Sequence, residues 1–90
     1  EGQLDEAVVW FERTLNIEPK NPAAWLRLAE VHLQRGSLES VVASARKARA
    51  LVDDDPRLLT QVMRMLDAGG GIEEASALRQ KLAESQSEKP

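Results

Sequence analysis

The feature that most constrains the fold of this chain is an internal repeat with a period of 34 residues. A shift by this period places Gly2 on Gly36 and Gly36 on Gly70, and it places Asn21-Pro22 on Asp55-Pro56. Matching apolar residues recur between these points. A match of this length, with glycines and prolines in phase, is too extensive for chance. We therefore expect the chain to be built from one repeated structural unit.

Each unit is predicted to contain two helices. Asn21 and Asp55 are favourable N-cap residues because a side-chain oxygen can accept from the first free backbone N–H groups, and proline follows each at the first helical position. Gly36 and residues 69–71 are predicted to end these helices, because the left-handed conformation at a helix C-terminus costs least for glycine. We expect helices at about 4–17, 22–35, 38 onward, 56–68 and 72 onward.

The residues at fixed places in the period resemble the tetratricopeptide repeat family. The family signature is Trp-x2-Leu-Gly-x2-Tyr on a first helix, followed by Ala-x3-Phe and Pro on a second helix. The similar segments here are Trp25-x2-Leu28-Ala29-x2-His32 for the first part and Ala7-x3-Phe11 with Pro19 for the second. The resemblance covers about residues 2–84. It is weakest in the third repeat, and His32 stands where the family has tyrosine.

This resemblance implies an all-α fold of five helices, in which antiparallel helical hairpins stack as a right-handed α-solenoid of about two and a half repeats. Phe11 and Trp25 are then expected to anchor the core. The predicted repeat domain, residues 1–84, divides into a half repeat at 1–21, a full repeat at 22–55 and a terminal repeat at 56–84. The polar segment 85–90 is predicted to be a flexible tail.

The composition argues against most kinds of chemistry. The chain has no cysteine and one histidine, so a metal site would need several carboxylates, and no suitable ligand spacing is present. We therefore expect neither a cofactor nor a catalytic site. The net charge of -3 provides no basic field for nucleic acid, and the apolar runs are too short for direct membrane insertion.

Four local features have both a structural and a functional interpretation. His32 lies on the apolar stripe of its helix, which favours packing over catalysis. Residues 69–71 precede a helix, but the lysine of a phosphate-binding loop is absent, so a turn is favoured. The basic cluster 46–49 and the acidic run 53–55 are interpreted as charges at helix ends rather than as nucleic-acid or calcium sites.

The resemblance also implies that the protein is not an enzyme but an interaction module that binds a peptide or a partner protein. In this family the first helices of successive repeats line the concave surface, and here these are residues 22–35 and 56–68. Leu26 and Leu33 are expected to lie beside the hairpin core, which does not require their side chains for its packing. The predicted partner-binding groove contains Leu26, Glu30, Leu33, Arg57, Thr60 and Arg64.

One subgroup of the family clamps the C-terminal carboxylate of chaperone tails with lysine, asparagine and arginine at fixed groove positions. Among the residues at the matching positions here, Arg57 has suitable chemistry and the others do not. This specificity is therefore not expected. The non-matching residues are Leu26, Arg27, Glu30, Thr60 and Gln61.

The alternative function is a structural or self-assembly segment of a larger repeat protein. Gly2 aligns with glycines at inter-helix turns, so we expect the chain to be a fragment in which helix 4–17 lacks a preceding partner helix. A homodimer through this open helix is the form of self-assembly considered. Trp10 is expected either to pack against the missing preceding helix or to face solvent.

Overall fold

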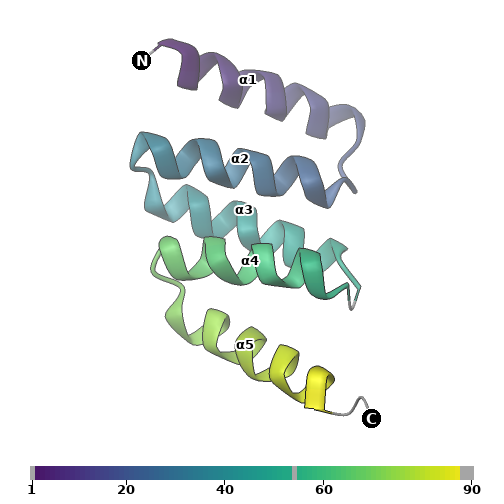
Figure 1. Cartoon of the computed structure of the whole chain (residues 1–90). Coiled ribbons are helices and arrows are strands. Elements are labelled where there is room, and N and C mark those ends of the chain that lie inside the picture. Colours follow the sequence, from purple (N-terminus) through teal and green to yellow (C-terminus); the bar gives the residue numbers. More distant parts are fainter. Residues whose placement is uncertain (1, 54, 88–90) are drawn as a thin grey trace.

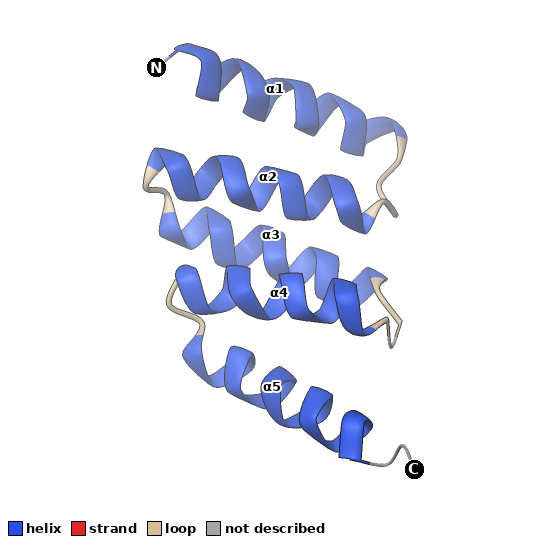
Figure 2. Cartoon of the chain, viewed as in Figure 1, coloured by secondary structure: helices blue, strands red, loops and turns tan. Residues whose placement is uncertain are grey.

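The computed structural model of the 90-residue chain describes residues 2–53 and 55–87, with the backbone alone for residues 85–87. Within these residues the chain forms helices joined by short loops and no strand (Figure 2). The predicted all-α fold of five helices is confirmed. The helices are α1 (Gly2–Ile17), α2 (Pro22–Arg35), α3 (Leu38–Leu51), α4 (Pro56–Ala68) and α5 (Ile72–Ser87).

Two helix boundaries differ from the sequence prediction. The first helix begins at Gly2, so Gly2 is helical and not part of a turn as its alignment with Gly36 and Gly70 led us to expect. The last helix continues to Ser87, beyond the start of the predicted tail at Ser85. Residues 88–90 of that tail lie outside the described part of the chain.

The N-terminal ends of α2 and α4 are fixed by the predicted caps. The Ala24 N–H donates to Asn21 Oδ1 at 3.2 Å, and the Arg57 N–H donates to Asp55 Oδ1 at 2.9 Å. Each bond satisfies a backbone donor that has no partner within its helix, and the following proline has no N–H to satisfy. The equivalent positions in the repeat therefore start equivalent helices.

The C-terminal ends of α2 and α4 also share one geometry. Gly36 and Gly70 have positive φ values of 80° and 94°. After each helix, two successive N–H groups donate back to carbonyl oxygens of the last turn, at 3.1 and 2.9 Å after α2 and at 3.2 and 2.7 Å after α4. This pattern of hydrogen bonds is the Schellman motif. It requires one residue in the left-handed conformation, which glycine adopts without strain. Glycines 34 residues apart thus form the same type of turn after α2 and after α4.

The five helices stack in sequence order, with neighbouring helices antiparallel (Figure 1). The stack measures 49 × 26 × 15 Å along its principal axes. The backbone of each helix approaches that of the next helix, and α2 also approaches α4. The two first helices of successive repeats, α2 and α4, therefore lie side by side. The right-handed winding expected of a longer stack stays a prediction.

Most of the buried apolar residues belong to two clusters that meet at Trp25. One cluster joins α1 to α2 through Val8, Leu15, Ala24 and Leu28. The other joins α2 to α3, α4 and α5 through Leu26, Ala45, Ala48, Val52, Leu59, Val62, Leu66, Ala75 and Leu78. Trp25 packs against both clusters and Phe11 against the first, so both residues contact the core as predicted. Each is half-buried rather than fully enclosed.

Gly69 allows the end of α4 to lie directly against the start of α3. A Cβ atom built on Gly69 would lie 2.7 Å from Val42 Cγ2 and 3.2 Å from the carbonyl oxygen of Leu38. The backbone at Gly69 has a φ of -88° and a ψ of -2°, the conformation of the third residue of a type I turn, which most residue types adopt. The requirement for glycine here is therefore a matter of space and not of backbone conformation.

We expect Gly69→Ala to lower the free energy of unfolding by about 1–3 kcal/mol, the usual cost of overpacking a close contact. Urea denaturation would measure this loss. Val42→Ala supplies the matched test, because it removes the methyl group that the new Cβ would meet. The double variant should lose less stability than the two single variants together. A Gly69→Ala chain as stable as the unmodified protein would contradict the close approach.

Candidate functional site

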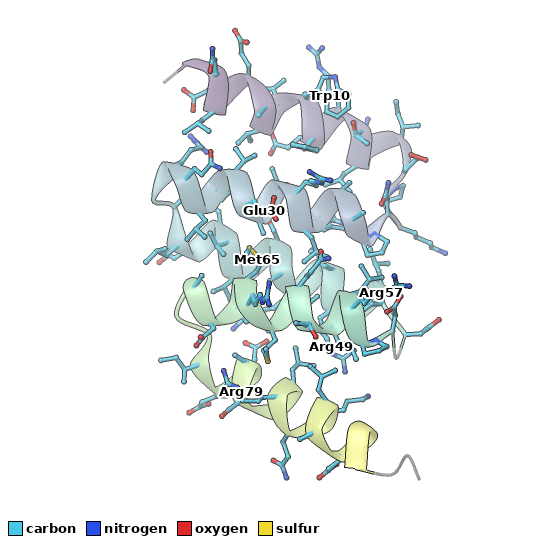
Figure 3. The ribbon with its side chains drawn as sticks, viewed as in Figure 1. Trp10, Glu30, Arg49, Arg57, Met65 and Arg79 are labelled. Atoms are coloured by element: carbon cyan, nitrogen blue, oxygen red, sulfur yellow. The ribbon has the colours of Figure 1, made fainter. Side chains whose placement is uncertain are left out.

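Eight of the exposed side chains of α2 and α4 occupy equivalent positions, whereas Arg35, Pro56 and Asp67 are exposed without an exposed counterpart in the other helix. On α2 the equivalent residues are Ala23, Arg27, Glu30 and Gln34, and on α4 they are Arg57, Gln61, Arg64 and Ala68. The second set follows the first by 34 residues at every position, and the buried residues Leu28 and His32 recur in the same way as Val62 and Leu66. We call these eight residues the first-helix stripe. Figure 3 labels Glu30 midway along α2 and Arg57 near the start of α4.

The structure divides the predicted groove residues into three groups. Glu30, Arg57 and Arg64 are exposed and belong to the first-helix stripe. Leu33 and Thr60 are half-buried, and the Thr60 hydroxyl donates to the carbonyl oxygen of Pro56 at 2.6 Å. This donor is therefore already satisfied within its own helix.

Leu26 forms the third group, and the prediction that the core does not need it is wrong. Its side chain is 3% exposed and lies in the cluster that includes residues of α3, α4 and α5. The physical reason is that α2 has three neighbouring helices, α1, α3 and α4. Its buried arc must cover all three, and Leu26 lies within that arc. With Leu26 in the core, the exposed stripe of α2 moves round to Ala23, Arg27, Glu30 and Gln34.

Arg27, Gln34, Gln61 and Ala68 belong to the first-helix stripe but were not among the predicted groove residues. The signal that identifies them is the spacing of Ala23, Arg27 and Glu30, which places them one above another on a helix. The same spacing recurs one period later. Polar residues at both sets of positions indicated the exposed side more directly than the leucines did.

The charge of the first-helix stripe is opposite to that of the whole chain. The chain carries a net charge of -3. The stripe contains three arginines, Arg27, Arg57 and Arg64, against one acidic residue, Glu30. Arg57 and Arg64 form no ion pair with other described residues. Their guanidinium groups are therefore available to carboxylates of another molecule, which they can bind in a bidentate manner.

His32 behaves as a packing residue. Its side chain is 9% exposed. Burial lowers the pKa of His32 below its ordinary value of 6.5, the positive charge of Arg35 lowers it further, and Glu12 has the opposite effect. The neutral ring is thus favoured at neutral pH. Across the described residues, no group of three or more histidine, cysteine, aspartate or glutamate residues is arranged to hold a metal ion.

The other features singled out in the sequence take part in helix ends and helix contacts. Residues 69–71 form the C-terminal turn of α4. In the basic cluster, the Arg46 guanidinium contacts Glu74 Oε1 at 2.6 and 2.8 Å, and this hydrogen bond raises the pKa of Arg46. In the acidic run, Asp55 caps α4, and Asp54 lies outside the described residues. Of the described helices, none is both long enough and apolar enough to span a membrane.

Comparison with known proteins adds one finding. A family model described as a tetratricopeptide repeat matches residues 1–66. The match includes α1, α2, α3 and most of α4. It therefore contains both signature segments, Ala7-x3-Phe11 with Pro19 and Trp25 to His32. A search of curated proteins found no match.

Proposed function

Because this chain belongs to the tetratricopeptide repeat family, we propose that it binds a peptide or a segment of a partner protein along the first-helix stripe. Members of this family are in general non-catalytic modules for protein–protein interaction. The family's concave surface is formed by first helices, which correspond here to α2 and α4. This correspondence supports the choice of the stripe over the other faces of the stack.

The observation that carries the proposal is the set of unpaired arginines on an otherwise acidic chain. Arg57 and Arg64 lie two helical turns apart on α4, which corresponds to about 10 Å along the helix axis. This separation spans about three residues of an extended peptide. We therefore propose an acidic segment as the ligand, with two carboxylates spaced to meet these arginines. Glu30 would repel acidic groups near the middle of α2 and so help to set the direction of the peptide.

Selection from a displayed library of random peptides tests this proposal. We expect the immobilised chain to enrich acidic peptides, and we expect Arg64→Glu to weaken their binding by about tenfold, equivalent to about 1.4 kcal/mol. The reason is that the substitution replaces an attractive charge with a repulsive one. Glu30→Arg should have the opposite effect and strengthen binding. Fluorescence anisotropy of the selected peptides would measure both changes.

Arg79→Glu is the matched control. Arg79 is also an exposed arginine, but it lies on α5, away from the first-helix stripe (Figure 3). The charge change of the control is the same, so a nonspecific attraction between an acidic peptide and the whole chain would be weakened equally. Equal loss of binding in Arg64→Glu and Arg79→Glu would refute the stripe. Unchanged binding in Arg64→Glu would refute it as well.

A second candidate function, self-assembly, is favoured by a different part of the molecule. The outer side of α1 carries exposed apolar side chains, among them Trp10, which is 63% exposed. Large apolar side chains that gather on one surface are typical of interaction sites. This surface lies on a different helix from the first-helix stripe, so the two functions do not exclude each other.

A further inference from the structure

The outer face of α1 carries three of the large apolar side chains that are well exposed on the described helices. Val9, Trp10 and Ile17 are 48%, 63% and 81% exposed. Val9 and Trp10 line an open hollow of about 360 Å³ together with Asp5, Glu6 and Arg13. The other large apolar side chains that are well exposed, Leu38 and Ile72, lie singly at the starts of α3 and α5. The apolar residues of α1 therefore form a patch, whereas those two do not.

Trp10 is held in a position to make contacts outside the chain. Its ring meets the ring of Phe11 edge-on, with the centroids 5.4 Å apart and an interplanar angle of 85°. Phe11 packs against the cluster between α1 and α2. The indole ring is thus supported from one side, and most of it remains in solvent on the outer side of α1 (Figure 3). Little side-chain freedom would be lost when another surface covers it.

The two ends of the stack differ in character. The exposed residues of α5 are predominantly polar and include Glu73, Ser76, Arg79, Gln80, Lys81 and Glu84. The outer side of α1 offers no matching surface for them. Contact between α1 of one copy and α5 of another would therefore leave Trp10 against charged groups. Contact between two α1 helices would bury the apolar patch of both copies. Because both copies use the same surface, this contact gives a two-fold symmetric dimer to which no further copy is added.

The charges on α1 fit this two-fold arrangement. Glu6 lies three residues before Val9, and Arg13 lies three residues after Trp10. If two α1 helices run antiparallel with the axis between Val9 and Trp10, each Val9 faces the Trp10 of the other copy. The same register places each Glu6 opposite an Arg13. A parallel arrangement would instead place like charges together.

These two charges are free to act between copies. Glu6 and Arg13 make no ion pair with other described residues, while the neighbouring Asp5 is bound to Arg35 at 3.0 Å. Glu6 and Arg13 are about 10 Å apart along the helix axis, too far to pair with each other. In a single antiparallel register, a second copy would therefore bury the apolar patch and also pair Glu6 with Arg13.

We propose that the protein forms a symmetric, antiparallel homodimer through the outer face of α1. In this dimer Trp10 packs on Val9 of the other copy, and Glu6 pairs with Arg13 of the other copy. A contact limited to one helix from each copy is smaller than the standard interface of roughly 1,200–2,000 Å². We therefore expect reversible association in the micromolar range. The dimer is independent of the proposed peptide binding, but it would place two first-helix stripes in one particle and give the avidity of a bivalent binder.

Sedimentation velocity over a range of concentrations tests the dimer with the chain as it is. We expect the unmodified chain to shift from monomer to dimer as its concentration rises. Glu6→Arg and Arg13→Glu should each raise the dissociation constant at least tenfold, because each variant brings like charges together twice. An equimolar mixture of these two variants should regain association as a heterodimer, since every facing pair is then of opposite charge. Trp10→Ala should abolish association.

Arg79→Glu is again the control and should leave the dissociation constant unchanged. Circular dichroism checks that each variant keeps its helical content, which is expected because the changed residues are exposed. Three results would overturn the proposal. They are a monomer at every concentration, a dimer that tolerates Glu6→Arg and Arg13→Glu, and a mixture that associates no better than its components. The first would show that a second copy of the chain does not cover this face.

Discussion

Leu59→Ala is expected to lower the free energy of unfolding by about 2–5 kcal/mol, the range measured when a large aliphatic side chain is removed from a core. The Leu59 side chain is 2% exposed and belongs to the cluster that joins α2, α3, α4 and α5. Its removal would leave a cavity that four helices cannot easily close. A domain of this size holds about 5–15 kcal/mol in total, so the variant is expected to unfold at a much lower urea concentration.

Leu38→Ala is the matched control for this experiment. It removes the same side-chain atoms, but Leu38 is 47% exposed at the start of α3. We expect a loss of less than about 1 kcal/mol, since less apolar area leaves water at this position on folding. Equal losses at Leu59 and Leu38 would show that the four-helix cluster does not dominate stability.

Trp25→Ala is expected to have the second-largest effect, a loss of about 2–4 kcal/mol, slightly below the range for a fully buried tryptophan. The side chain packs against both core clusters, and its Nε1–H donates to the carbonyl oxygen of Pro19 at 3.1 Å. Removal should therefore weaken the connection between the two clusters. Hydrogen exchange should show the amides of α1 opening before those of α4, which reflects loss of cooperativity along the stack.

Phe11→Ala distinguishes this connection from a simple loss of apolar area. Phe11 packs against the cluster of α1 and α2 alone. We expect Phe11→Ala to increase exchange in α1 while α4 and α5 retain their protection. If Trp25→Ala and Phe11→Ala gave the same exchange pattern, Trp25 would not be the residue that couples the two clusters.

The helices could be predicted from the sequence because local residues determine their ends. Asn21 and Asp55 cap α2 and α4 with hydrogen bonds to the residues next to them, and Gly36 and Gly70 supply the left-handed turns. Each of these interactions lies within a few residues of the chain. The 34-residue period then indicated which helices are equivalent. These observations were sufficient for the fold class.

The candidate site was harder to predict because it depends on which helix lies beside which. Leu26 is buried in a cluster with residues of α3, α4 and α5, and the pattern of α2 alone does not reveal these neighbours. Glu30, Arg57 and Arg64 were placed correctly on an exposed side because charged residues rarely lie in a core without partners. Trp10 was ambiguous for the same reason as Leu26. Its exposure depends on whether a further helix covers α1.

The order of the helices along the stack also has a consequence for how the chain folds. Each helix packs against the helix next to it in sequence, and the longer-range backbone contact, between α2 and α4, skips a single helix. Contacts of such short sequence separation require the closure of short loops, and this favours rapid folding. The α1–α2 pair is therefore able to form while α5 is still being synthesised, so the order of synthesis would become the order of assembly.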